Sequence, residues 1–380
     1  MITVLIATGI MNAGGAETLI MEMLRHRSSR IKYILLIHHN GSPIKGVYDE
    51  EISKMNIPMV YIPSIGCIGM KQYCEVFKEK IKTIGYIDVL HLHLNAIGGI
   101  ISKAAKEAGI KNRIIHSHAD ITYTGQKLSI LMSETKLALL KKYVNHFGTD
   151  FWACSEAAGK RLFKQNRTIK IIPNVIDVEK YLPAKEKHDV VRKRLGFTNQ
   201  LVLGSVGRIA PIKNYEFVFR VLSTLKKRGV SVCFVCFGRE IDAAYFASLT
   251  ELAEKLDVSD CVHFMGNSNN IPEDIAGLDV FLMPSKSEGF GMAAIEAQAA
   301  GIPAIVSTGV PTIVDVGLGL IQFLPFETEQ WANAIEKAGM MVRPSNENII
   351  KAFDQHGFNS PTAVKNIEAE YIKMMGNQRG

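Results

Sequence analysis

The sequence predicts an α/β protein made of two doubly wound, Rossmann-like domains. Short β-branched or apolar runs alternate with amphipathic helical stretches, a pattern typical of parallel sheets covered by helices on both faces. A chain of 380 residues with 47% hydrophobic content is long for a single core. The alternation restarts after a polar, charged stretch near residue 185, so we expect two such domains, with ligands beyond the carboxyl ends of the strands.

Each predicted element follows from its local pattern. Residues 16–26 form a predicted helix because Leu19, Ile20, Met23 and Leu24 lie on one stripe, and 214–229 is a second amphipathic stretch. Apolar runs predict strands of the first domain at 2–8, 32–39, 59–63, 88–94 and 113–118. The corresponding runs of the second domain are 201–207, 230–238, 261–266, 279–285 and 303–307.

The net charge of +7 is unevenly distributed. Residues 1–185 hold 25 Lys and Arg against 15 Asp and Glu, whereas 186–380 hold 19 against 22. The basic half suggests an anionic partner, such as a phospholipid surface, a phosphorylated lipid or nucleic acid, and a solvated face without a partner explains the charge equally well. Nucleic acid is disfavoured, since no binding motif is recognisable and aromatic residues make up only 8%.

The N-terminal sequence, the lengths of the apolar runs and the cysteine content lead us to expect a cytoplasmic protein. "MITVLIATGI" has neither a basic flank nor a cleavage site, and no apolar run approaches the ~18 residues that a membrane span needs. Six scattered cysteines do not form a disulfide framework. Cys233 and Cys236 lie three apart on a predicted strand and therefore point to opposite faces, so we expect core residues rather than a metal pair.

The loop after the first strand, "TGIMNAGGAE", leads directly into a helix. Gly14 and Gly15 would let the backbone approach a phosphate at the helix N-terminus, although a turn that merely needs glycine explains them as well. A dinucleotide-binding enzyme would show G-x-G-x-x-G here and an acid after the second strand. Neither is present, so an oxidoreductase is disfavoured.

The second domain carries charged residues at two strand ends. Arg208 and Lys213 follow the first strand in "GSVGRIAPIKN", where two cations can neutralise a diphosphate. Glu288 precedes a glycine-rich turn, and Glu296 follows on an otherwise apolar, alanine-rich helix. A sheltered carboxylate such as Glu296 needs hydrogen-bond donors or water.

Together these stretches resemble a known family. The chain resembles the retaining, nucleotide-sugar-dependent glycosyltransferases of the GT-B fold, in the branch that builds bacterial capsular polysaccharides and exopolysaccharides. The resemblance lies in "GRIAPIKN" and "SEGFGMAAIEAQAAGIP" of the second domain. Earlier in the chain it includes "NAGGAE", "HSH", and "ACSEAAGKRL" before "IIPNVIDVEKY". The resemblance covers nearly the whole chain, and Glu288 and Glu296, with seven residues between them, are its most specific part. It implies an acceptor-binding domain at 1–182 facing a donor-binding domain at 183–360 across a cleft, and a helix in 361–380 that crosses back onto the first domain.

The resemblance also implies roles for the motif residues. Arg208 and Lys213 would bind the donor diphosphate and stabilise the leaving group, and Glu296 would accept hydrogen bonds from the ribose hydroxyls. Glu288 would hold the transferred sugar together with backbone N–H groups of the turn, which are those of Gly289, Phe290 and Gly291. Gly14 and Gly15 would approach the phosphates, and no metal or other cofactor is implied.

Three further positions bear on this resemblance. The family's active-site histidine corresponds to His118, but His116 lies on the same face of the predicted strand and remains an alternative. Ser155 is expected to cap a helix. Many relatives have a glutamate in a "GG-x-x-E" segment where this chain has a shortened turn with Asp315, which leaves the donor base and sugar undecided.

The function expected from these features is retaining transfer of a hexose or N-acetylhexosamine. The donor would be a nucleotide diphosphate sugar, with UDP favoured, and the acceptor a lipid-diphosphate-linked saccharide. The enzyme would be metal-independent and peripheral on the inner face of the cell membrane. Two alternatives remain: a sugar-nucleotide epimerase of the same architecture, and a non-catalytic nucleotide-sugar-binding subunit.

Overall fold

A computed structural model describes residues 1–12, 14–118, 127–182, 184–268 and 270–376. The chain forms two compact units, each described here by itself. Unit 1 comprises Met1–Ile176 and Ser360–Gly380, and unit 2 comprises Asp177–Asn359. The sequence-based limits lie at residues 182 and 360. Unit 1 is therefore built from both ends of the chain.

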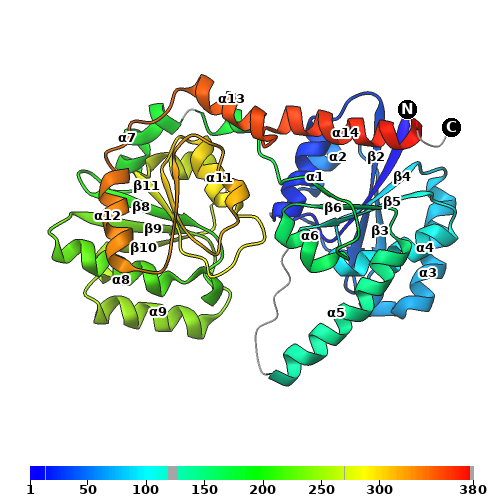
Figure 1. The fold of residues 1–380 in the computed structure, drawn as a ribbon, viewed down its shortest axis with the longest axis horizontal. Helices are drawn as coiled ribbons and strands as arrows, with labels where there is room; N and C mark the ends of the chain where they lie inside the picture. The colour runs from blue at the N-terminus through cyan, green and yellow to red at the C-terminus, as the bar shows by residue number, and fades with distance from the viewer. Residues whose placement is uncertain (13, 119–126, 183, 269, 377–380) are drawn as a thin grey trace. The chain divides into compact units, whose positions relative to one another are not determined.

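Unit 1 contains a parallel sheet with the strand order β3-β2-β1-β4-β5-β6-β7 among its described residues (Figure 1). All of its strand pairs are parallel. Its strands are β1 (Ile2–Thr8), β2 (Ile31–His39), β3 (Met59–Pro63), β4 (Val89–Leu92), β5 (Asn112–Ser117), β6 (Asp150–Ala153) and β7 (Ile169–Ile171). The chain reverses its direction of winding between β1 and β4, where neighbouring strands are not consecutive.

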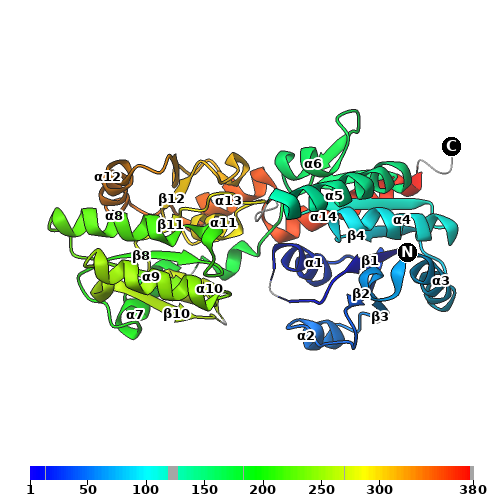
Figure 2. The same ribbon diagram turned by 90° about the horizontal axis from the view of Figure 1, so that it is seen from below.

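Helices cover both faces of this sheet (Figure 2). They are α1 (Gly15–Arg25), α2 (Asp49–Lys54), α3 (Ile65–Ile84), α4 (Gly98–Glu107), α5 (Lys127–Phe147), α6 (Glu156–Leu162) and α14 (Ser360–Gly376), with a 3-10 turn, η1 (Asn95–Ile97). α4 packs against α3 and α5. Gly99 permits this approach, because a Cβ there would lie 2.4 Å from the backbone nitrogen of Val144 on α5.

The helix α14 packs beside α1 and completes the core of unit 1. Its residues Val364, Ile367 and Tyr371 are buried in one apolar cluster with side chains of α1 and of the central strands. Tyr371 stacks on Trp152 of β6 with ring centroids 5.9 Å apart. The last helix of the chain is thus an integral part of the first unit.

Unit 2 repeats the architecture with the strand order β10-β9-β8-β11-β12-β13. Its strands are β8 (Leu201–Val206), β9 (Val232–Phe237), β10 (Val262–Gly266), β11 (Val280–Met283), β12 (Ala304–Ser307) and β13 (Ile321–Leu324). All pairs are parallel, and the winding reverses between β8 and β11. The predicted pair of doubly wound, Rossmann-like domains is confirmed.

The helices of unit 2 surround this sheet. They are α7 (Ala184–Arg194), α8 (Tyr215–Lys227), α9 (Ala243–Lys255), α10 (Ile271–Asp274), α11 (Met292–Ala299), α12 (Thr328–Ala338) and α13 (Asn346–His356), with 3-10 turns η2 (Val178–Lys180), η3 (Pro211–Lys213), η4 (Ser259–Cys261), η5 (Ile275–Gly277) and η6 (Thr312–Val314). α8 packs against α9 and α12, and α11 packs against α13.

Several local predictions can be compared with the structure. Cys233 and Cys236 are free and buried in β9, as expected for core residues. Ser155 caps α6, because its side chain accepts a hydrogen bond from the Ala158 N–H at 3.2 Å. None of the helices in the described part of the chain combines the length and apolarity needed to cross a bilayer.

Candidate active site

The loops after β8 and β11 lie at the position where ligands bind to doubly wound sheets, beyond the strand ends at the reversal of winding. The β8 loop contains Lys213, and the β11 loop contains Glu288. Their side chains form an ion pair with Nζ 2.6 Å from Oε1, and both are largely buried, with 18% and 16% of the side chain exposed. The structure therefore brings two of the sequence-predicted residues into direct contact.

Backbone contacts hold these loops together. The Lys286 N–H donates to the Ile212 carbonyl at 2.8 Å, which joins the β11 loop to the η3 turn. The Glu288 N–H donates to the Gly309 carbonyl at 3.0 Å, which joins the same loop to the one after β12. The geometry of the ion pair is thus imposed by three neighbouring strand ends.

Gly207 shapes the path of the Lys213 side chain. Its φ of +150° lies at the edge of the region that favours glycine, and a Cβ there would lie 3.2 Å from Cε of Lys213. Arg208 comes next and is exposed. Its neighbour Ile209 is fixed by a hydrogen bond from its N–H to the Arg239 carbonyl at 2.9 Å, so the two predicted cations project from an anchored loop.

The turn between Glu288 and α11 presents mainly its backbone. Phe290 is 4% exposed and packs edge-on against Phe358, so its side chain belongs to the core. Gly291 has φ +102°, a left-handed conformation that glycine adopts without strain, and it precedes the first residue of α11. Any ligand contact by Gly289, Phe290 and Gly291 would therefore come from backbone groups.

Glu296 lies on the second turn of α11, among buried apolar residues. Burial raises the pKa of its carboxyl group to about 7, and a hydrogen bond with the side chain of Tyr181 opposes the shift. One carboxylate–phenol contact is a small complement for a group that can accept several hydrogen bonds. The geometry leaves Glu296 suited to a ligand that supplies hydroxyl donors.

In unit 1, Gly14 and Gly15 lie at the start of α1. Gly14 is extended, with φ −141°, and α1 begins at Gly15. The carboxylate of Glu17 lies close above this turn, since a Cβ on Gly14 would fall 2.4 Å from its Oε2. Burial raises the pKa of Glu17, which is consistent with a sheltered helix N-terminus.

The two candidate histidines differ in exposure. His116 is fully buried in β5, whereas His118 follows the strand and is partly exposed. The His118 N–H donates to Oδ1 of Asn95 at 2.9 Å, and its Nε2 lies 2.7 Å from Nδ1 of His93. Burial lowers the pKa of His118 to about 4, and Asn174 opposes this shift, so the ring is neutral at physiological pH.

Sequence analysis did not single out His93, Asn95 and Asn174, which lie around His118. Asn95 has the uncommon φ of +48°, and Asn174 is 3% exposed. A signal for His93 was present, because "HLHL" repeats at the end of β4 the His-x-His alternation of "HSH" in β5. The parallel register then brings both pairs of histidines to one face of the sheet.

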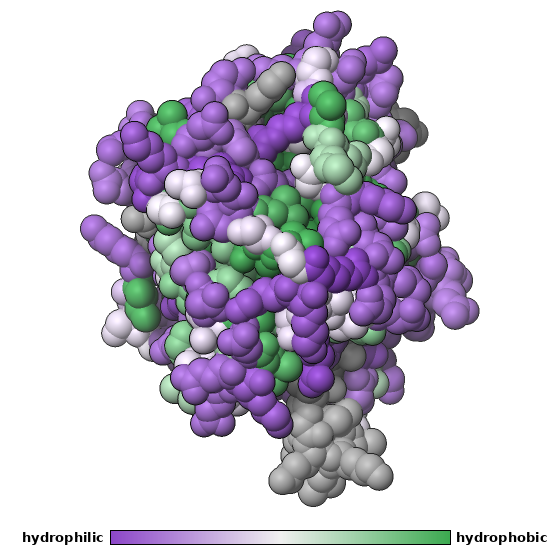
Figure 3. Space-filling view, turned by 90° about the vertical axis from the view of Figure 1, so that its left-hand side faces the viewer, coloured by the Kyte–Doolittle hydropathy of each residue, from purple (hydrophilic) through white to green (hydrophobic). Residues whose placement is uncertain are grey.

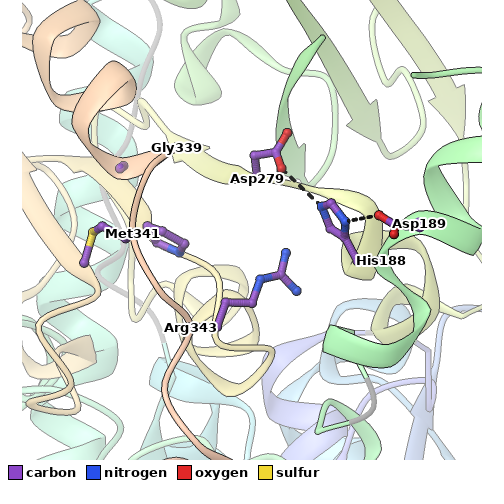
Figure 4. Close-up of a pocket in the computed structure, with 8 residues that line it drawn as sticks. His188, Asp189, Asp279, Gly339, Met341 and Arg343 are labelled. Atoms are coloured by element: carbon purple, nitrogen blue, oxygen red, sulfur yellow. Dashed lines mark hydrogen bonds and ion pairs between the residues drawn. The ribbon is translucent and has the colours of Figure 1, made fainter. Parts of the chain in front are cut away.

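A pocket of about 270 Å³ lies at the opposite edge of the unit 2 sheet (Figure 4). Asp279 and Pro303, which directly precede β11 and β12, contribute to its lining, so it lies at the amino ends of these strands. Figure 4 shows His188 between Asp189 and Asp279, and its ring nitrogens lie 2.9 and 3.1 Å from their carboxylate oxygens. None of the sequence-predicted residues is among the eight that line it.

Exposed apolar side chains occur beside these pocket residues in the sequence. Met340, Val342 and Val190 are 78%, 89% and 69% exposed. On the face of unit 2 seen in Figure 3, apolar residues gather in the middle of a mainly hydrophilic surface. The polar pocket and the exposed apolar residues are separate from the loops that carry Lys213 and Glu288.

Residues 187–350 match the family model described as glycosyl transferases group 1. EpsF of Bacillus subtilis (strain 168), whose name provisionally describes it as a glycosyltransferase, is 31% identical to this chain over 362 residues. The match covers 93% of this chain and 92% of EpsF. A galactosyltransferase of Escherichia coli, named UDP-Gal:α-D-GlcNAc-diphosphoundecaprenol α-1,3-galactosyltransferase, is 25% identical over 91% of this chain and 90% of its own.

Solved structures share the same fold. HepE of Anabaena, crystallised with UDP and glucose, superposes with a TM-score of 0.78 at 19% identity, covering 98% of this chain and all of its own. At this identity the likeness shows the fold alone. It confirms the GT-B fold, that is, the arrangement of two parallel-sheet, Rossmann-like domains in one chain.

Proposed function

This chain belongs to the group 1 glycosyltransferases, and we propose that it transfers a hexose or N-acetylhexosamine from a nucleotide diphosphate sugar, with retention of configuration, to a lipid-diphosphate-linked saccharide. We place this reaction in capsular polysaccharide or exopolysaccharide synthesis, as the sequence motifs imply. The ion pair between Lys213 and Glu288 is the observation that carries the proposal.

The position of this ion pair supports a donor site in unit 2. Arg208 and Lys213 supply two positive charges where β8 ends, and Glu288 supplies a carboxylate where β11 ends. A diphosphate bound beside Lys213 would share this cation with Glu288, while Arg208 would add a bidentate contact. These charges can neutralise the diphosphate without a metal ion, so we propose that the transfer is metal-independent.

The proposed chemistry follows from these charges. The bond between the anomeric carbon of the sugar and the diphosphate oxygen breaks, and the electron pair leaves with the nucleoside diphosphate. A new bond forms from the acceptor hydroxyl oxygen to the same face of that carbon, and the hydroxyl proton passes to the departing phosphate. Arg208 and Lys213 stabilise the negative charge that develops on the leaving group, which is the largest contribution expected in such a site.

The remaining site residues would orient the donor. Glu296 would accept hydrogen bonds from the two ribose hydroxyls, and Glu288 with the backbone of Gly289, Phe290 and Gly291 would hold the sugar. By the family resemblance, His118, which burial keeps neutral, would contact the sugar, and Gly14 and Gly15 would approach the phosphates. UDP is the favoured nucleotide, because the name of the Escherichia coli relative specifies a UDP-sugar and HepE crystallised with UDP.

A lipid-linked acceptor fits the charge distribution. The same relative is named for an acceptor on diphosphoundecaprenol, and the first half of this chain carries the excess of Lys and Arg. Basic side chains attract anionic headgroups and lipid diphosphates alike. We therefore propose a cytoplasmic enzyme that associates peripherally with the inner face of the cell membrane.

A donor panel tests the proposed function. The purified chain is incubated with radiolabelled UDP- and GDP-sugars and a membrane extract, and label in the lipid fraction is measured. Transfer is expected from a UDP-sugar and should be lost in Lys213→Ala. Interconversion of the nucleotide sugar without an acceptor would instead identify an epimerase, and donor binding without any turnover would identify a non-catalytic subunit.

A further inference from the structure

Strands β4 and β5 are neighbours in the sheet of unit 1 (Figure 1). Four histidines form one layer at the carboxyl ends of these two strands. His91 and His93 come from β4 and the residue after it, and His116 and His118 come from β5 and the residue after it. Neighbouring rings lie close together but tilted, with centroids 4.1 Å apart for His91 and His93 and for His116 and His118. The role proposed above for His118 does not account for the other three.

Three of these rings direct a nitrogen toward a common region. One ring nitrogen each from His91, His93 and His116 lie within 4.8 Å of one another. Nε2 of His91 and Nδ1 of His116 are 3.1 Å apart, close to the spacing of about 3.4 Å expected between two nitrogens of a tetrahedral zinc site with Zn–N bonds of ~2.0–2.1 Å.

His93 supplies the third nitrogen. Its Nδ1 lies 2.7 Å from Nε2 of His118. Its Nε2 has no hydrogen-bond partner, and water cannot readily supply one, because the residue is only 5% exposed. A buried polar atom without a partner loses its hydration and gains no interaction in return, which is unfavourable. An ion between the three rings would remove this deficit.

The second nitrogens of two of these rings face polar groups. Nδ1 of His91 lies 2.7 Å from the Tyr371 hydroxyl, and Nδ1 of His93 lies 2.7 Å from Nε2 of His118. The second nitrogen of His116, Nε2, is buried and makes no hydrogen bond. Metal-binding histidines show the arrangement of His91 and His93, in which a polar neighbour of the second nitrogen fixes the ring.

The surroundings of the cluster also suit a cation. All three rings are buried, and the neutral imidazole is the form that binds metal. Trp152 packs edge-on against His91 and His116 and shields the layer on one side. Imidazole nitrogens favour zinc and its late first-row neighbours over magnesium or calcium.

We propose that His91, His93 and His116 form a binding site for one Zn²⁺ ion, which binds Nε2 of His91, Nε2 of His93 and Nδ1 of His116. The site lies entirely in unit 1 and is separate from the cations that we assign to the donor diphosphate in unit 2. With Nε2 of His93 on the ion, its Nδ1 carries the hydrogen and donates it to Nε2 of His118. The ion thereby fixes the orientation of the His118 ring.

Zinc binding to the untagged, full-length chain tests this proposal without any sugar donor. Bound metal is removed with EDTA, the chelator is removed by dialysis, and Zn²⁺ is titrated by calorimetry in a Cys67→Ser background, because Cys67 is the exposed thiol. We expect one equivalent to bind, and binding to weaken at least ~100-fold in His93→Gln, which removes a direct ligand. His39→Gln is the matched control, since His39 is also buried at a strand end but lies outside the cluster.

Two further measurements use the unsubstituted chain, so they do not depend on whether a variant folds. Co²⁺ bound to the unsubstituted chain should show the intense visible absorption of four-coordinate cobalt with nitrogen ligands. Zn²⁺ should raise the thermal midpoint of the same chain, because an ion that binds the native state stabilises it.

The proposal is overturned if the chain with His91, His93 and His116 intact binds no Zn²⁺ in calorimetry, or if His93→Gln and His39→Gln bind it equally. The histidine layer would then be a hydrogen-bonded core element only. Failure of zinc binding leaves the donor panel unaffected, and a negative donor panel leaves the zinc titration unaffected, so the two proposals fail independently.

Discussion

Replacing Glu296 by Gln should change how donor affinity depends on pH. Burial raises the pKa of this carboxyl group to about 7, so the carboxylate that would accept the ribose hydroxyls is incompletely ionised near neutrality. Gln keeps the size and helix propensity of the side chain but cannot ionise. The parent enzyme should therefore bind donor more tightly as the pH rises, and Glu296→Gln should bind it weakly at every pH.

The expected change in the donor dissociation constant follows from the value of this pKa. With a value of about 7, roughly one-tenth of Glu296 is ionised at pH 6 and roughly nine-tenths at pH 8, so the donor dissociation constant should fall ~10-fold across this interval. At pH 8 the loss of two charge-assisted hydrogen bonds in Glu296→Gln should weaken binding by about 10- to 100-fold. His118 does not interfere, because its pKa of about 4 lies well below the interval.

The same substitution should stabilise the protein against unfolding. A carboxyl group whose pKa is higher in the folded than in the unfolded state opposes folding once it ionises, and this penalty grows as the pH rises from the unfolded value of 4.5 to about 7. The penalty is at most about 3.5 kcal/mol above pH 7, at ~1.4 kcal/mol per pKa unit between 4.5 and about 7. Glu296→Gln should thus unfold at higher denaturant concentration than the parent at pH 8, and at a similar concentration at pH 5.

Calorimetry with UDP-galactose and UDP-N-acetylglucosamine at pH 6, 7 and 8 measures the binding effect, because their diphosphates do not titrate in this range. Glu251→Gln, on the exposed surface of α9, is the matched control and should retain the parent's pH dependence. A 2′-deoxyribose donor should lose affinity in the parent but much less in Glu296→Gln. Equal pH dependence in both proteins, or additive losses with the deoxy donor, would refute the ribose contact.

Three further predictions concern other parts of the molecule. Lys213→Ala should lower turnover at least ~10²-fold with a smaller change in donor binding, and the control Lys227→Ala should leave turnover unchanged. Normal turnover of Lys213→Ala in a steady-state assay would remove Lys213 from the site. Binding to anionic vesicles in a flotation assay should weaken steeply with salt, since exposed charges are screened beyond about 10 Å at 0.1 M, and equal binding to neutral vesicles at high salt would contradict a role for the basic half. Asp279→Asn should lower the free energy of urea unfolding by about 2–3 kcal/mol, because it leaves Arg192, which is 7% exposed, without its carboxylate partner; Asp257→Asn is the exposed control, and equal effects of the two would contradict the argument.

The sequence predicted the long elements of the fold because their patterns are periodic. Strands β1, β2 and β9 are continuous apolar runs, and α8 places its buried residues on one stripe. Among the strands of only three or four residues, β4, β11 and β12 were predicted and β6, β7 and β13 were not. Such short segments do not establish a period, and their pairing with a neighbouring strand is visible only in three dimensions.

The site was predictable to a similar degree. Lys213 and Glu288 belong to distinct sequence motifs, so their common location could be expected, but their 2.6 Å contact depends on three loops held together by backbone hydrogen bonds. His93 and Asn174 were missed because each contacts His118 from another part of the chain. Contacts of this kind follow from strand register, which a single sequence does not reveal.

The return of α14 to unit 1 has a consequence for how the protein is made. Unit 2 is one continuous segment and is complete before α14 leaves the ribosome. Unit 1 begins first, yet Tyr371, which packs on Trp152 and hydrogen-bonds His91, is synthesised only after all of unit 2. The second unit can therefore finish folding before the first, reversing the usual N-to-C order, and nascent unit 1 must keep an apolar face uncovered until α14 has been synthesised.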